Sequence, residues 1–338
     1  MSTASALAAS IHLVAAPTDI SRVSRYVMGT SITVEAYGAT ESARTVAIEE
    51  AFAAFAEIDR LMSNYRDDSE LSQINRRAAT EPVPISAPMF SVLQAAQRVS
   101  AMSGGAFDVT VGPIVRLWGL YDKVAHIPGE TELAAVRPLV DYRNLALDST
   151  QHTVRFARAG VNVDLGGIAK GFAVEVAANA LRQHGLSGLI DAGGNQYLLG
   201  TPPGKPSWTT GIRSAEGERV LIGVLETGET SISTSANYST FVELNGRKYG
   251  HIIDPRTLRP SDASLSVTIV SRDGTVADAL SKAVFILGHD AGLKLAESVP
   301  GTAAVVAYRR SDGRIGVVRS KSLASAFHVT DARVIVDP

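Results

Sequence analysis

The chain has 338 residues, of which 45% are hydrophobic and 20% charged. This composition supports a sizeable core and excludes a protein that is disordered throughout. The 32 basic and 34 acidic residues leave a net charge of −2. Because nucleic-acid-binding proteins usually carry a basic stripe and no block of five like charges occurs here, we do not expect a nucleic acid as partner.

The sequence contains no run of 18 apolar residues, so no transmembrane helix is expected. The absence of cysteine excludes disulfides, thiolate metal sites, a cysteine nucleophile and a lipoprotein anchor. Residues 1–22 are expected to form a flexible tail, since Ser10 and His12 interrupt the only apolar stretch that could serve as a secretory signal. We expect a cytoplasmic protein, or an exported one if the start codon is placed too far downstream.

The first third of the chain alternates strand and helix patterns. Residues 26–37 alternate and are rich in β-branched residues, which predicts a strand. Apolar residues spaced three or four apart predict a helix over 41–62. A short helix from Ser69 and an amphipathic helix over 88–102 follow, the latter ended by two glycines.

The rest of the chain is richer in strand patterns. We predict strands over 152–157, 161–165, 188–192, 265–270, 302–308 and 314–320, helices over 170–184, 276–287 and 290–298, and strands with hairpin turns such as Asn245-Gly246 within 200–250. No repeat or linker divides the chain. Residues 23–338 are therefore expected to form one domain of the α+β class.

The segment from Val161 to Gly171 combines features of an anion site. Asp164 ends a predicted strand, and Gly166, Gly167 and Lys170 precede a predicted helix. Glycines let backbone amides approach an anion, and the helix N-terminus and the lysine favour negative charge. The spacing matches neither named phosphate-loop motif. A tight turn with a solvated lysine remains the alternative.

Other segments carry side chains suited to chemistry, and each has a structural alternative. Gly193-Gly194 forms a second glycine turn, Ser231 to Ser235 offers hydroxyls, and His251 precedes the turn at Asp254. The alternatives are an ordinary turn, a polar strand and a structural histidine. Asp278 and Lys282 are also candidate site residues, with an ordinary i,i+4 ion pair as the alternative. Phe107-Asp108 and Trp118 could contact a ring system, with core packing as the alternative.

Eight segments, taken together and in order, resemble the FAD:protein FMN transferases of the ApbE family. They lie between Tyr26 and Gly288 and comprise Met28 to Thr30, Ser63 to Asn75, Gly105 to Leu120, Asp164 to Gly171, Gly193 to Asn195, Ile232 to Tyr238, His251 to Pro255 and Ala277 to Ser281. Each segment alone is a modest signal, whereas the ordered set is highly specific.

The resemblance implies an α+β fold of the T-fold type, with mixed sheets and helices around a central FAD cleft. It implies an enzyme that uses magnesium to split the pyrophosphate of FAD. The FMN half is then joined by a phosphoester bond to a threonine or serine of an acceptor flavoprotein, and AMP is released. Some relatives mainly hydrolyse FAD to FMN and AMP.

The resemblance also implies roles for particular residues. The FAD site would comprise Met28, Asp108, Asp164, Gly166, Gly167, Lys170, Glu175, Thr234, Ser235 and His251. Lys170 would neutralise the phosphates, and His251 would be the general base for the acceptor hydroxyl, a role that suits its ordinary pKa. Magnesium would be held by the backbone carbonyl of Ala169 and the carboxylate of Asp278, both hard oxygen ligands.

Three positions depart from the family pattern. Lys282 stands in place of the usual threonine, Ala236 in place of a glycine and Leu258 in place of another glycine. Lysine offers no oxygen to a metal and repels a cation. A metal-independent or non-catalytic FAD-binding protein and an FAD pyrophosphatase therefore remain alternatives to the transferase.

Overall fold

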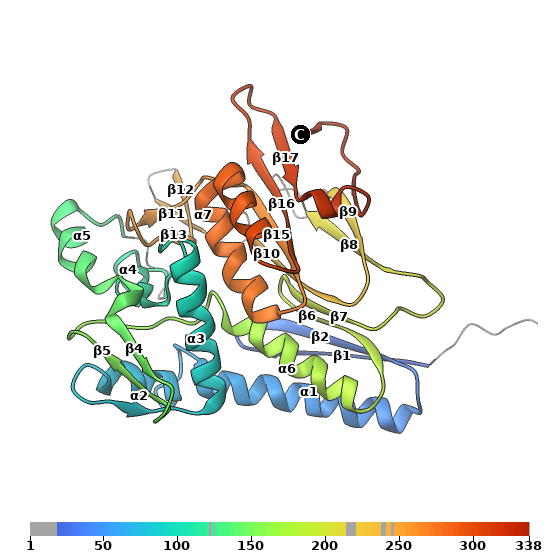
Figure 1. Cartoon of the computed structure of the whole chain (residues 1–338), viewed down its shortest axis with the longest axis horizontal. Helices are drawn as coiled ribbons and strands as arrows, with labels where there is room; N and C mark the ends of the chain where they lie inside the picture. The colour runs from blue at the N-terminus through green and yellow to red at the C-terminus, as the bar shows by residue number, and fades with distance from the viewer. Residues whose placement is uncertain are drawn as a thin grey trace, which may run out of the picture.

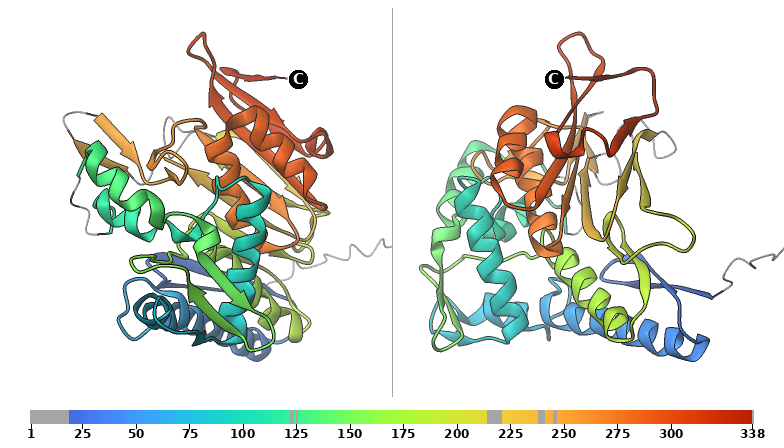
Figure 2. Two further views of the ribbon diagram at one scale, coloured as in Figure 1. Left: turned by 60° about the vertical axis from the view of Figure 1, so that its left-hand side comes forward. Right: turned by 45° about the vertical axis from the view of Figure 1, so that its right-hand side comes forward.

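The computed structural model describes residues 19–121, 124, 126–213, 221–237, 241–244 and 247–337. Helices and mainly antiparallel strands make up this part of the chain, which confirms the predicted α+β class (Figure 1). A large central sheet is covered by helices on one face and by a smaller sheet on part of the other (Figure 2).

The central sheet has the strand order β1-β2-β6-β7-β10-β15-β16-β17-β19. Its strands, in that order, are Ile20–Val27, Thr30–Tyr37, Ser187–Ala192, Asn195–Leu199, Thr230–Ala236, Ser266–Ser271, Thr302–Arg309, Ile315–Arg319 and Val334–Val336. Neighbours are antiparallel except for β17 and β19. In β2, Ile32, Val34 and Ala36 are fully buried and point to one face, as the two-residue period of a strand requires.

Three long helices cover one face of this sheet. α1 (Glu41–Met62) packs on β1 and β2, α6 (Ala169–Gln183) on β6 and β7, and α7 (Gly274–Ser298) on β10, β15 and β16. The apolar residues predicted to share one face of α1 are buried, and Thr40 caps the helix by accepting the N–H of Ala43. α3 (Ala87–Met102) packs against α7.

A second apolar core joins the opposite face of the sheet to a three-stranded sheet of order β18-β9-β8. These strands are Phe327–Val329, Leu221–Thr227 and Trp208–Arg213. Ile232 and Val305 of the central sheet meet Leu225 and Phe327 of the small sheet in this core.

Most of the remaining elements lie beside the helical layer, whereas the 3-10 helix Lys321–Leu323 packs on β16 and contributes Leu323 to the second core (Figure 1). The remaining elements are α2 (Glu70–Arg77), α4 (Gly112–Leu117), α5 (Glu130–Val136), β3 (Val83–Pro84), β4 (Leu145–Asp148), β5 (Thr153–Phe156), β11 (Phe241–Leu244), β12 (Arg247–Gly250), β13 (Ile253–Asp254), β14 (Arg259–Pro260) and four short 3-10 helices (Val109–Val111, Arg137–Leu139, Tyr142–Asn144, Lys321–Leu323). A third core, centred on Trp118, Ile114 and Leu258, joins α4 and α5 to the β13–β14 turn.

Two predicted strands are wrong in detail. Residues 26–37 are not one strand, because the chain reverses at Met28 and Gly29, whose φ angles are +52° and +73°. Residues 161–165 form no ladder with another strand. The side chain of Asn75 takes the place of a neighbouring strand there, donating to the carbonyl of Val163 and accepting its N–H.

Other predictions hold with small shifts. The predicted helices over 276–287 and 290–298 form α7, which is interrupted at Gly288 by a φ of +77°. The predicted turn residues Asn245 and Gly246 lie outside the described residues, but β11 and β12 pair with Leu244 opposite Arg247, as a two-residue hairpin requires.

The predicted N-terminal tail falls mostly on residues 1–18, which lie outside the described residues. Its boundary at residue 22 is wrong, because β1 begins at Ile20 and pairs with β2 along its whole length. Within the described ranges, no helix has both the length and the hydropathy needed to span a bilayer.

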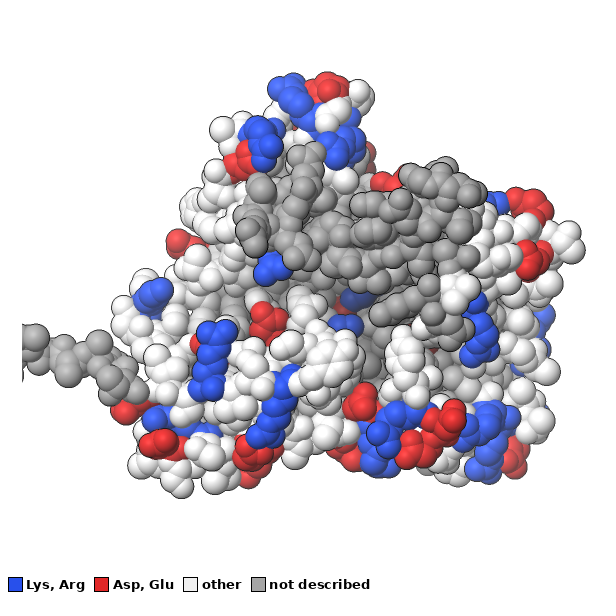
Figure 3. Space-filling model, turned by 180° about the vertical axis from the view of Figure 1, so that it is seen from behind, with Lys and Arg blue, Asp and Glu red and all other residues white. Residues whose placement is uncertain are grey.

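Basic and acidic side chains are interspersed on the face shown in Figure 3. Several exposed arginines form ion pairs elsewhere in the described chain, for example Arg60 with Glu57 and Arg77 with Glu81, each at 2.7 Å. Exposed pairs of this kind contribute little to stability.

Candidate functional site

Two glycine-containing turns and one strand end meet at the edge of the central sheet that is formed by the ends of its strands. β2 begins at Thr30, next to the end of β6, and β7 begins at Asn195, next to the end of β10. The N–H of Thr234 donates to the carbonyl of Gly194 at 2.9 Å. The Met28-Gly29 turn, the Gly193-Gly194 turn and the end of β10 therefore lie together.

Gly193 shows why this edge needs a glycine. Its φ is +63°, and a Cβ atom there would lie 2.6 Å from the hydroxyl oxygen of Thr30. A side chain would meet both backbone strain and a steric clash. The two turns can therefore approach closely only because Gly193 has no side chain.

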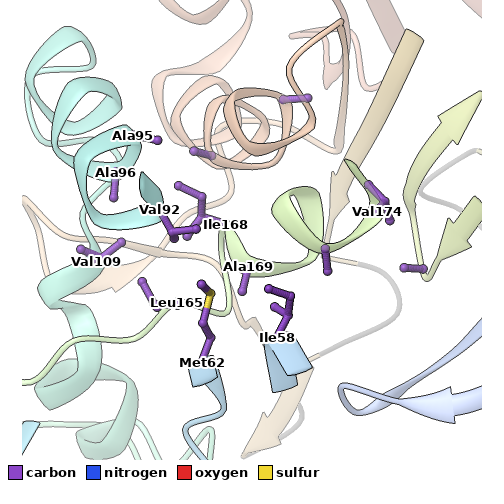
Figure 4. Packing of buried hydrophobic residues seen from close by; sticks show 14 of the residues in the cluster. Ile58, Met62, Val92, Ala95, Ala96, Val109, Leu165, Ile168, Ala169 and Val174 are labelled. Carbon is purple, nitrogen blue, oxygen red and sulfur yellow. The ribbon is translucent and has the colours of Figure 1, made fainter. Parts of the chain in front are cut away.

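The predicted glycine and lysine turn connects an extended segment to α6. Asp164 accepts the N–H of Gly166 through Oδ1 at 2.6 Å, and the hydroxyl of Tyr121 donates to Oδ2. The turn is anchored by Leu165, Ile168 and Ala169, which lie in the core beside residues of α1 and α3 (Figure 4). Gly166 remains exposed and Lys170 half-buried, so the turn presents backbone and an ammonium group outward.

Lys170 begins α6 together with Ala169, and its Nζ lies 3.4 Å from the carbonyl of Gly166. The side chain of Lys282 reaches the same turn from α7. A Cβ on Gly167 would lie 3.9 Å from both Cγ and Cδ of Lys282. Two lysines from different helices thus converge on one glycine turn.

Asp278 is fully buried and surrounded by donors. Its Oδ2 accepts the N–H of Gly171 at 2.9 Å, and its Oδ1 accepts from the hydroxyl of Ser233 at 3.4 Å and from the ammonium of Lys282. The Lys282 side chain is only 19% exposed. The pair is therefore a buried ion pair rather than the solvent-exposed i,i+4 pair that the sequence left as the alternative.

A chain of hydroxyl groups extends from this ion pair to β10. Ser281 hydrogen-bonds Ser235 at 2.7 Å and donates to the carbonyl of Asp278 at 2.7 Å. Ser233 also donates to the side-chain oxygen of Asn195 at 2.7 Å. The polar side chains of β10, β7 and α7 thus form one buried network.

Helices α6 and α7 approach closely at Gly171. A Cβ there would lie 2.1 Å from the carbonyl oxygen of Gly274 and 2.5 Å from the Cβ of Asp278. Glu175 strengthens the contact because its carboxylate accepts the N–H of Gly274 at 2.9 Å, at the N-terminus of α7. Burial raises the pKa of Glu175, and the nearby Asp273 raises it further.

His251 follows β12 and lies near the same edge of the sheet. It is half-buried, and the preceding Gly250 lies against Asn237, which directly follows β10. Asp254, in contrast, is used within its own turn. Its carboxylate accepts from the backbone and guanidinium of Arg256 at 2.8–2.9 Å.

Asp108 and Met28 make structural contacts. Asp108 accepts the N–H and the hydroxyl of Thr110, both at 2.7 Å, and therefore caps a 3-10 turn. Burial raises the pKa of Asp108 to about 6. The Met28 side chain packs against the main core. Trp118 is a core residue, which is the alternative that the sequence analysis gave for it.

Charges in the site affect one another. Burial lowers the pKa of the Lys282 ammonium, Asp278 acts in the opposite direction, and Lys170 lowers it further. Burial also raises the pKa of Tyr121, with a further contribution from Asp164, so this phenol remains a hydrogen-bond donor.

The arrangement does not fit the expected magnesium ion. Both carboxylate oxygens of Asp278 are engaged by hydrogen-bond donors, one of which is a cation. The Ala169 carbonyl belongs to the first turn of α6, near Gly171. Among the residues the structure describes, no group of three or more His, Asp or Glu side chains could hold a metal.

Sequence reasoning missed several members of the network. Ser281 follows Asp278 by three residues, so the helical period could have placed it beside Asp278 and Lys282. Tyr121 and Asn75 contact the segment around Asp164 across long sequence separations. No local pattern marks such contacts.

Comparison with known proteins gives consistent matches. A model of the ApbE family matches residues 28–306. The FAD:protein FMN transferase of Treponema pallidum (strain Nichols) is 32% identical over 329 residues, covering 92% of this chain and 90% of that protein. That of Vibrio cholerae serotype O1 is 34% identical over 254 residues, covering 72% and 75%.

Solved structures agree with these matches. The flavin transferase ApbE from Vibrio cholerae superposes with a TM-score of 0.82 at 29% identity, over 92% of this chain and 100% of that chain. The ApbE protein from Thermotoga maritima gives 0.81 at 28% identity, over 90% and 97%. Sequence and fold together show that the chain belongs to the ApbE family.

Proposed function

We propose that this protein is an FAD:protein FMN transferase. It binds FAD, transfers the FMN half to a threonine or serine of an acceptor flavoprotein and releases AMP. The observation that carries the proposal is the convergence of Lys170, its glycine turn and the end of β10 at one edge of the sheet, in a chain of the ApbE family.

The chemistry of this edge suits a pyrophosphate. The turn at Gly166 and Gly167 presents backbone to solvent, and Lys170 and Lys282 supply positive charge beside it. Phosphoryl transfer requires neutralisation of charge on the transferred group, and fixed cations provide it. On β10, the half-buried Thr234 hydroxyl pairs with that of Thr268 at 2.9 Å, and the buried Ser235 hydroxyl pairs with that of Ser281 at 2.7 Å.

The reaction exchanges one phosphorus–oxygen bond for another. The acceptor hydroxyl oxygen attacks the phosphorus of the FMN half, and the bond from that phosphorus to the bridging oxygen breaks. AMP leaves with the bridging oxygen, and the hydroxyl proton passes to a base. His251 is the candidate base because it is half-buried near this edge.

The proposal is tested by incubating the purified protein with FAD and a threonine-bearing acceptor domain. We expect AMP release together with a gain in acceptor mass equal to that of FMN minus one water. The matched control is an acceptor in which the threonine is replaced by valine, which has the same shape and no hydroxyl. AMP release without any acceptor modification would contradict the transferase and favour the pyrophosphatase.

Magnesium is varied in the same assay. The family resemblance suggests a magnesium requirement, whereas the engagement of Asp278 by Lys282 argues against it. Parallel reactions with magnesium and with EDTA therefore measure whether this chain shares that requirement.

A further inference from the structure

The ammonium group of Lys282 contacts the carboxylate of Asp278, which would otherwise be available to a metal ion. Asp278 is fully buried, and an isolated buried carboxylate is costly unless it is paired. Its Oδ2 accepts the Gly171 N–H, and its Oδ1 accepts from the Lys282 ammonium. A metal at this carboxylate would have to displace the ammonium.

The side chain of Lys282 also borders the glycine turn that is proposed to bind the ligand. Its stem passes Gly167, on the turn that carries Lys170, and its side chain retains 19% exposure. If the ion pair only stabilised the fold, the Lys282 side chain would not need to extend to the exposed glycine turn. Lys170 and Lys282 bring two ammonium groups to this edge, where the neighbouring carboxylates are Asp278 and, on the glycine turn itself, Asp164.

We infer that the Lys282 ammonium occupies the cation position of this site, so that the chain binds the pyrophosphate of a flavin dinucleotide without a divalent metal. The identity of the ligand rests on the proposed function. The occupation of the carboxylate by an ammonium group rests only on the contacts of Lys282 and Asp278. The two parts can therefore be tested separately.

The first experiment uses metal alone, without flavin. Mn²⁺, which reports its binding by electron paramagnetic resonance, is titrated into the wild-type protein and into Lys282→Thr and Lys282→Met. We expect no stoichiometric binding to the wild type and one site in Lys282→Thr, because threonine removes the cation and adds an oxygen ligand. Lys282→Met, which preserves length without an oxygen, is the matched control and should bind no metal tightly.

The second experiment measures FAD affinity by calorimetry with EDTA and with magnesium. Wild-type affinity should be the same in both. Lys282→Met should bind FAD about tenfold more weakly in both, since a charge-assisted contact is lost. Lys282→Thr should be equally weak with EDTA and recover with magnesium. Circular dichroism checks the fold, and Asp278→Asn with Lys282→Met provides a neutral pair if Lys282→Met alone is unstable.

Two results would overturn the inference. One is stoichiometric Mn²⁺ binding to the wild type that Asp278→Asn abolishes, together with FAD affinity that collapses in EDTA. The other is the absence of Mn²⁺ binding in Lys282→Thr as well as in the wild type. If no form of the protein binds FAD, the proposed function fails, while the Mn²⁺ titration still decides whether Lys282 holds a cation position.

Discussion

The indole nitrogen of Trp118 donates to the backbone carbonyl of Leu258 at 2.9 Å, joining two residues that are 140 positions apart. Both side chains are buried, and Leu258 adopts a φ of +62°. That conformation favours glycine, the residue that the family pattern leads one to expect there. The chain therefore combines backbone strain at Leu258 with the burial of a leucine side chain in the third core.

Replacing Leu258 separates these two effects. Leu258→Gly relieves about 1 kcal/mol of left-handed strain but removes a buried side chain worth about 2–5 kcal/mol. We expect a net loss of about 1–4 kcal/mol in the free energy of unfolding, measured by chemical denaturation. Leu258→Ala keeps the strain and should be about 1 kcal/mol less stable than Leu258→Gly. The reverse order of the two variants would contradict the strain argument.

A methyl group at Gly171 should disrupt the contact between α6 and α7. The added Cβ would lie 2.1 Å from a backbone oxygen of α7, which cannot move as a side-chain tip can. We expect Gly171→Ala to reduce the free energy of unfolding by about 3 kcal/mol or more and to weaken FAD binding, because Asp278 must shift. The control is Gly228→Ala, where a Cβ would meet nothing within 4 Å. Equal stability of the two variants would refute the packing described here.

Asp108 should make stability depend on pH between about 4 and 6. Burial raises its folded pKa to about 6, from an ordinary value of 3.8, so the folded state holds the proton longer. The unfolded state ionises first as pH rises, and stability therefore falls across this window. In Asp108→Asn, the decrease in the free energy of unfolding across this pH window should be smaller by about 2–3 kcal/mol.

The measurement is urea denaturation of wild type and variant at several pH values within that window. The matched control is Asp148→Asn, since the exposed Asp148 carboxylate accepts the N–H groups of Thr150 and Gln151 and its pKa is lowered. Asp148→Asn should retain the wild-type slope between pH 4 and 6. A wild-type slope that survives in Asp108→Asn would rule out Asp108 as its source.

Local patterns predicted most of the elements, because periodicity and caps are local properties of the sequence. The helix over 41–62 has the predicted bounds, and its apolar face is buried. An extended apolar segment has the same sequence pattern whether or not it pairs with another strand, so the pattern of residues 161–165 predicts a strand. Here the backbone bonds the side chain of Asn75, 88 residues away, and the backbone of Val109 and Gly112, and no local pattern predicts these contacts.

The candidate site was predictable as a set of residues but not as a network. The resemblance brought Ser235 and Asp278 forward, and the packing of α7 on β10 explains why they lie in one network. Asp108 is expected to line the ligand site, and its Oδ1 caps a turn; its place in the ligand site stays a prediction. The choice between capping and binding depends on side-chain direction, which spacing does not determine.

His251 is predicted to act in transfer more than in binding. His251→Ala should keep FAD affinity within a few-fold of wild type and slow AMP release about 100-fold or more, the usual contribution of a general base. Calorimetry gives the first quantity and AMP quantification the second. The control is His184→Ala, whose imidazole pairs with Glu50 at 2.9 Å at the end of α6. Loss of FAD binding in His251→Ala would instead assign His251 to holding the ligand.

Lys170 is predicted to contribute directly to FAD affinity. Its ammonium lies 3.4 Å from the Gly166 carbonyl, a weak contact, so Lys170→Ala should change the free energy of unfolding by less than about 0.5 kcal/mol. The same change should weaken FAD binding at least several-fold, because a charge-assisted contact with phosphate is lost. Lys294→Ala, at an exposed position of α7, provides the matched control and should leave FAD affinity unchanged. The two quantities are measured by urea denaturation and by calorimetry. Equal FAD affinity in Lys170→Ala and wild type would remove the flavin phosphates from the glycine turn, whereas a large loss of stability would make Lys170 a structural residue.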